Sequence, residues 1–146
     1  RDFCLSRGLG DVYKRQVEAC HRRGIRVVPL VGPSSIVMAV MASGLNGQSF
    51  AFNGYLPVKP PERVQAIRRF ERRAHAEGQS QLFIEAPYRN VKLMEQLLQT
   101  LAPETRLTVA MDITAPGEFI RTLRVREWRA AELPAMNKRP AIFIIG

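Results

Sequence analysis

The sequence predicts an α/β fold with a mixed sheet, and three observations favour this class. β-Branched and aromatic runs alternate with segments whose apolar residues recur at helical spacing along most of the 146 residues. Two strand-like runs near the end follow each other closely, which favours a mixed sheet over a purely parallel one. The hydrophobic content of 46% is typical of a folded globular chain, not of a disordered one.

The first predicted elements form a strand, a tight turn and a helix. Residues 17–24 are typical of the last turns of a helix, with basic residues near its end and Gly24 as its cap. The β-branched run 25–30 predicts a strand. The nearly all-apolar segment 34–44, bounded by Ser and Gly, predicts a buried helix. Together they make half of a parallel α/β unit.

The later elements follow a turn-rich stretch at 45–49, which we take as the domain boundary. Apolar runs between turn residues predict strands over 50–56, 81–87, 106–113, 118–125 and 140–146. Helical spacing predicts helices over 62–78 and 89–103. Four aromatic residues lie inside apolar strands and are expected in the core, namely Phe50, Phe52, Phe83 and Phe143.

Composition restricts the class of function. The formal net charge of +9 suits a nucleic acid or another polyanion, although a solvated basic surface without such a partner is the alternative. No apolar run approaches the ~20 residues of a membrane span, and no signal peptide is visible, so we expect a cytoplasmic protein. Cys4 and Cys20 lack metal or redox spacing, and no zinc-protease, CxxC or Walker motif occurs, so we expect no metal.

Three stretches at strand ends are candidate sites. GPSS (32–35) precedes the apolar helix, where free backbone N–H groups can serve a ligand; simple capping of the helix by Ser is the alternative. FIEAPYRN (83–90) ends a strand with Glu85, which is either a site carboxylate or an Arg-paired structural one. DITAPGEFIRT (112–122) places Asp112 before a loop that is either a binding loop or an ordinary turn.

Five segments follow one another within residues 17–146, namely GIRVVPLVGPSSIVMAVMASGL, FNGYLPVKPPER, LFIEAPYRN, DITAPGEFIRTLRVREW and RPAIFIIG. In this order they resemble the tetrapyrrole methylase superfamily, and they look most like its small-subunit rRNA cytidine 2′-O-methyltransferase branch. The sequence departs from that branch at Tyr88, where His is usual, and at 112–117, where Glu-Leu-Thr and charged residues are usual.

The resemblance implies a homodimeric enzyme that binds S-adenosyl-L-methionine in a cleft between two α/β domains. Its implied cofactor contacts are Ser34, Ser35, Ile36, Ile84, Glu85, Pro140 and Ala141. A ribose hydroxyl is a poor nucleophile that gains from a base, for which Glu85 and Asp112 are the candidates. We expect ribosomal RNA phosphates to meet the basic side chains of Arg68, Arg69, Arg72, Arg73 and Arg89. A corrin or porphyrin methylase and an inactive basic RNA-binding module remain as alternatives.

The first residues do not fit this pattern. Residues 6–16 resemble a translated sequencing adapter, and the glycines of GLGD (8–11) lack a predicted strand before them and a helix after them. We therefore expect residues 1–16 to be foreign and loosely held, 17–46 to be the remnant of an N-terminal α/β domain, and 47–146 to be the C-terminal α/β domain. We expect such a truncated chain to be inactive alone.

Overall fold

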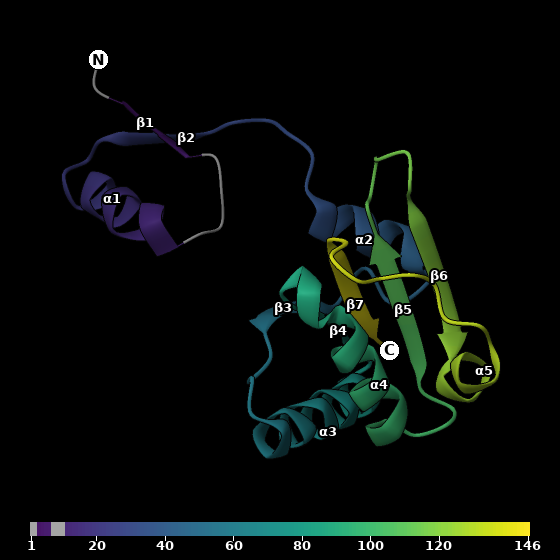
Figure 1. Ribbon diagram of the computed structural model, residues 1–146. Coiled ribbons are helices and arrows are strands. Elements are labelled where there is room, and N and C mark those ends of the chain that lie inside the picture. The colour runs from purple at the N-terminus through teal and green to yellow at the C-terminus, as the bar shows by residue number, and fades with distance from the viewer. Residues whose placement is uncertain (1–2, 7–10) are drawn as a thin grey trace. The chain divides into compact units, whose positions relative to one another are not determined.

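The computed structural model describes residues 3–6 and 11–146, which fall into two compact units (Figure 1). The division lies after Pro33. Sequence alone placed the boundary after residue 46, beyond the apolar helix. That helix belongs to the second unit because its Ala39 and Val40 face is buried on the sheet of that unit.

The first unit contains two parallel strands and a helix. Its elements are β1 (Phe3–Ser6), α1 (Asp11–Arg22) and β2 (Arg26–Pro29). β1 and the first turns of α1 lie within residues 1–16, and the expectation that this segment is foreign and loosely held stays a prediction. Strand β1 precedes the GLGD stretch (8–11), and helix α1 begins at its last residue, Asp11. Residues 8–10 of this stretch lie outside the described part. Backbone pairing with β2 is a long-range interaction that a local apolar pattern does not reveal.

The second unit is a mixed five-stranded sheet with helices on its faces. Its strands are β3 (Phe50–Tyr55), β4 (Ser80–Ile84), β5 (Arg106–Met111), β6 (Phe119–Arg124) and β7 (Ala141–Ile145). Its helices are α2 (Ser35–Ser43), α3 (Pro60–Glu77), the 3-10 turn η1 (Pro87–Arg89), α4 (Asn90–Thr100) and α5 (Val125–Ala130). The order in the sheet is β3-β4-β7-β5-β6, with only the β3–β4 pair parallel. The predicted mixed sheet is confirmed.

Apolar side chains cover both faces of this sheet because strand residues alternate between them. One face carries the larger core beneath α3, α4 and α5, where Phe83 stacks between Phe70 and Phe143 with centroid separations of 6.2 and 5.9 Å. The other face carries Leu82, Ala110, Ile142 and Ile144 beneath α2. Helix α2 ends at Gly44, whose φ of +69° is the left-handed conformation that glycine adopts freely.

Two local features differ from the sequence-based expectations. The strand expected over 118–125 is present as β6, but the helix α5 that follows it from Val125, held by the buried Trp128, was not expected. The indole N–H of Trp128 donates to the carbonyl of Leu107 at 2.8 Å. Phe50 and Phe52, expected in the core, are 38% and 40% exposed because β3 is an edge strand with little cover. Among the described residues, no helix combines the length and hydropathy of a membrane span.

Candidate functional site

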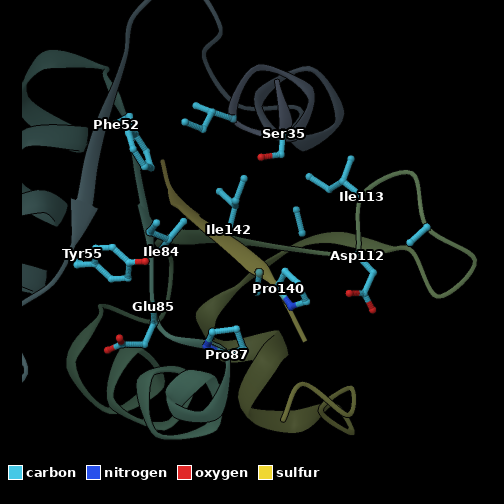
Figure 2. Close-up of a pocket in the computed structure, with 14 residues that line it drawn as sticks. Ser35, Phe52, Tyr55, Ile84, Glu85, Pro87, Asp112, Ile113, Pro140 and Ile142 are labelled. Atoms are coloured by element: carbon cyan, nitrogen blue, oxygen red, sulfur yellow. The ribbon is translucent and has the colours of Figure 1, made fainter. Parts of the chain in front are cut away.

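A cleft of about 500 Å³ lies in the second unit, on the sheet face that carries α2 (Figure 2). The carboxyl ends of β3, β4 and β5 and the start of β7 meet at this edge, because β7 runs antiparallel to its two neighbours. Ligand sites of α/β sheets form at such strand ends. The cleft is lined by Ser35, Ile36, Phe52, Tyr55, Ile84, Glu85, Pro87, Ala110, Asp112, Ile113, Ala115, Pro140, Ala141 and Ile142.

The beginning of α2 forms one side of the cleft. Ser34 is the extended residue before the helix and makes no side-chain cap hydrogen bond, so the capping interpretation of this serine is not supported. Ser35 directs its hydroxyl into the cleft (Figure 2). The first N–H groups of a helix have no partner inside it, so this turn offers several donors to a ligand. The other end of α2 is fixed by the hydroxyl of Thr122 on β6, which donates to the carbonyl of Ser43 at 2.7 Å.

An irregularity in β3 brings Tyr55 to the cleft. Phe52 pairs with Leu82 and Tyr55 pairs with Ile84, so β3 holds one residue more than β4 between these positions. The extra residue is accommodated at Gly54, with φ +66°. Without it, Tyr55 would face the opposite side of the sheet from Phe52, because strand residues alternate. A glycine inside a strand signals such a bulge, and this signal could have revealed Tyr55 in the sequence.

Glu85 lies beside the cleft in a buried ion-pair cluster. Its carboxylate accepts from Arg63 at 2.8 Å, from Arg89 at 3.0 Å and from the N–H of Ala86 at 2.7 Å. The hydrogen bond to Glu85 raises the pKa of Arg89 above its already high ordinary value, so the Arg89 guanidinium stays charged at physiological pH. Figure 2 shows the carboxylate directed away from Ile84 and Pro140. These contacts favour the Arg-paired structural interpretation over that of a catalytic base.

Asp112 is held by a third arginine, Arg139, which connects two loops of the cleft. Arg139 Nε donates to the Asp112 carboxylate at 2.6 Å, Nη1 donates to the Ala135 carbonyl at 2.7 Å, and Nη2 donates to the Gly117 carbonyl. The loop after β5 is strained, since Thr114 has φ +67°, a conformation disfavoured for a β-branched residue. Arg139 therefore holds a strained cleft loop in place, and it was not recognised from the sequence.

The predicted basic residues occupy two different places. Four of them, Arg68, Arg69, Arg72 and Arg73, are exposed on α3. Arg73 is within 3.5 Å of Glu77, and the Arg69 guanidinium lies 5.3 Å from the centroid of the Phe70 ring. Arg89 is separate from this group, because it lies in η1 with Glu85 as its partner.

The structure brings six of the seven predicted cofactor residues into one cleft, and only Ser34 is not among the lining residues. The other lining residues come from β3, from Pro87 at the start of η1, from the loop after β5 and from apolar positions of β5 and β7. No group of three His, Cys, Asp or Glu side chains suited to a metal ion occurs within the part of the chain that the structure describes. His21 and His75 are exposed.

Curated relatives are ribosomal RNA small subunit methyltransferases I. The protein of Vibrio cholerae is 31% identical over 119 residues, which are 82% of this chain and 40% of the relative. Those of Escherichia coli O157:H7 and Mesorhizobium japonicum are 30% and 32% identical, over 94% and 86% of this chain and 46% and 43% of the relatives. The chain thus spans less than half the length of these relatives. No family model matches the sequence.

Two solved structures share the fold. The crystal structure of the methyltransferase CobJ matches with a TM-score of 0.56 at 17% identity, over 95% of this chain and 60% of that one. The cobalt precorrin-4 methyltransferase CbiF matches with a TM-score of 0.54 at 16% identity, over 92% of this chain and 57% of that one. At these identities the likeness concerns the fold alone.

Proposed function

The chain is homologous to part of the ribosomal RNA small subunit methyltransferases I and belongs with them to the tetrapyrrole methylase superfamily, and from this premise we propose that its cleft binds the methyl donor of an RNA 2′-O-methyltransferase. The observation that carries the proposal is the convergence of six predicted donor contacts on one cleft of about 500 Å³. This volume lies within the range of small-molecule sites, roughly 300–1,000 Å³.

S-Adenosyl-L-methionine suits the surfaces of this cleft. Its purine ring is apolar on both faces and fits against Ile84, Ala141 and Ile142, which line the floor. Its carboxylate suits the Ser35 hydroxyl and the free N–H groups at the start of α2. The donor supplies an already activated methyl group, so the protein has mainly to hold a ribose hydroxyl in line with it. Because Glu85 and Asp112 are both engaged by arginines, we assign neither as a base.

Blocking the cleft is expected to weaken donor binding. Ala115 is exposed on the strained loop and lines the cleft, so Ala115→Trp adds bulk there without changing the core. We expect S-adenosylmethionine affinity, measured by equilibrium dialysis, to fall about tenfold or more, a loss equivalent to about 1.4 kcal/mol. Ala130→Trp, at an exposed position of α5 outside the cleft, is the matched control. Equal affinities of the two variants would contradict the placement of the donor.

RNA is the proposed substrate because the curated relatives at about 30% identity carry that name, whereas the corrin enzymes share only the fold. The exposed arginines of α3 support this proposal. A homodimer, as the family resemblance implies, is part of the same proposal. An inactive RNA-binding module would have no use for a cleft with apolar walls and unpaired helix donors at its rim.

Removing the α3 arginines is expected to weaken RNA binding mainly at low salt. Changing Arg68, Arg69, Arg72 and Arg73 to Gln should reduce the slope of log affinity against log salt by up to about 3, since each phosphate contact with a single strand contributes about 0.7. The control variant removes the same charge elsewhere. In it four other exposed arginines are changed to Gln, namely Arg106, Arg121, Arg124 and Arg126. Equal slopes for the two variants would show that net charge alone, not the α3 face, attracts RNA.

A further inference from the structure

Two exposed aromatic rings line the cleft, and a third exposed ring, that of Tyr88, belongs to the residue after a lining residue. Tyr55 and Tyr88 are each 65% exposed, and Phe52 is 40% exposed. Phe52 and Tyr55 line the cleft, and Tyr88 directly follows Pro87, which also lines it. In Figure 2 the Tyr55 hydroxyl is directed toward Ile84 inside the cleft. Large aromatic surfaces are costly to leave in water, so their clustering at a ligand site points to a partner that covers them.

The Tyr88 ring is held in position from one side. The Arg89 guanidinium carbon lies 4.7 Å from the ring centroid, and Arg89 Nη1 donates to the Tyr88 hydroxyl at 2.5 Å. Arg89 is itself anchored to the buried carboxylate of Glu85 at 3.0 Å. A fixed cation thus lies against the hydroxyl end of the ring, and the high exposure of the residue leaves most of the ring open to solvent. Such a ring is ready to stack on a planar group without further ordering.

Positive charge continues beside this ring. Arg89 also lines a hollow of about 350 Å³ between α3 and α4, together with Arg63, Lys92 and the acidic Glu95. The Arg63 guanidinium is occupied by Glu85, Gln96 and the Pro57 carbonyl. Lys92, one turn after Arg89, is exposed and available to an anion. A planar aromatic face with an adjacent exposed ammonium matches a nucleotide, whose base stacks and whose phosphate is anionic.

We propose that Tyr88, backed by Arg89, is the stacking platform for one unpaired base of an RNA substrate, with the neighbouring phosphate at Lys92. The inference rests on the proposed function for its location beside the donor cleft. It adds that the protein binds its RNA substrate as a single strand or loop. The base faces of a duplex are already stacked on one another inside the helix, so a lone exposed ring has no free base face to stack on.

The test compares a fluorescein-labelled single-stranded RNA with the duplex of the same sequence, by anisotropy at fixed low salt. We expect Tyr88→Ala to weaken single-strand binding by about fivefold or more, the lower limit for one stacked base, and to leave duplex binding unchanged. Tyr88→Phe keeps the ring and is expected to retain single-strand binding. Lys92→Gln is expected to weaken single-strand binding and to reduce its salt dependence by about one phosphate contact.

Equal effects of Tyr88→Ala on single strand and duplex, or no effect on either, would overturn the platform. Failure of Tyr88→Phe to retain binding would also contradict it, because the hydroxyl and not the ring would then be the contact. Tyr88 does not line the donor cleft, so Tyr88→Ala is expected to bind S-adenosylmethionine as the unchanged chain does. Absence of donor binding in the unchanged chain would contradict the proposed function and leave the stacking result standing.

Discussion

Replacing Glu85 by Ala is expected to lower the free energy of unfolding of the second unit by about 3–5 kcal/mol, the range for breaking a buried ion pair. The side chains of Arg63 and Glu85 are 5% and 1% exposed, so the substitution leaves the Arg63 guanidinium buried without a counter-charge. It also releases Arg89, which is 28% exposed and can be hydrated. The measurement is urea denaturation followed by Trp128 fluorescence, because this only tryptophan is buried in the second unit.

Two variants make this expectation specific. Glu77→Ala breaks the exposed Arg73–Glu77 pair, and we expect a loss within about 0.5 kcal/mol. Combining Glu85→Leu with Arg63→Met removes both buried charges at similar volume, and we expect it to recover most of the loss. A small effect of Glu85→Ala would mean that the carboxylate contributes little to stability. The alternative of a carboxylate reserved for chemistry would then regain support.

Replacing Arg139 by Met is expected to loosen the cleft. The substitution removes three hydrogen bonds from a charged donor and leaves the half-buried Asp112 without its partner, at a cost of about 1–3 kcal/mol in unfolding free energy. Because Asp112 and Pro140 both line the cleft, donor affinity is expected to fall as well. Arg139 acts here as a positioning residue, since it is not itself among the cleft-lining residues.

The matched control for Arg139 is Arg129→Met. Arg129 also joins two segments through main-chain carbonyls, donating to Leu98 at 2.7 Å and to Leu101 at 3.0 Å, but it lies away from the cleft. We expect a comparable loss of stability without a change in donor affinity. If both variants lowered the affinity equally, the effect of Arg139 would be one of general stability and not of loop position.

The strands of the second unit could be predicted because they follow from local patterns. The turn before α2, the strand end at Glu85 and the strand end at Asp112 are all marked by Pro, Gly or Ser next to apolar runs. Glu85 and Asp112 lie at one edge because β4 and β5 both run antiparallel to β7, whereas the place of the turn before α2 in the same cleft was implied by the family resemblance. The interpretation of GPSS as a turn that faces a ligand rests on the same reasoning and stays a prediction.

The partners of the site residues could not be predicted, because they come from distant parts of the chain. Arg63 precedes Glu85 by 22 residues, and Arg139 follows Asp112 by 27, so only the packing of α3 and of the segment before β7 brings them together. Phe52 and Tyr55 were missed as cleft residues for another reason. Phe52 looked like a core residue in an apolar run, and the bulge at Gly54 reverses the facing of Tyr55.

The most direct test of the donor cleft is an amide-resolved NMR titration of S-adenosylmethionine into the unchanged chain. Tyr55 and Ala115 are exposed, so this cleft alone leaves more of a ligand in water than a site that buries roughly 70–90% of it, and we expect weak, saturable binding. The expected shift changes are concentrated at Ser35, Ile36, Ile84 and Ala141, and S-adenosylhomocysteine should produce the same set. Absence of saturable shifts, or shifts that map to α3 or β6 and not to the cleft, would contradict a methyl-donor site in this part of the molecule.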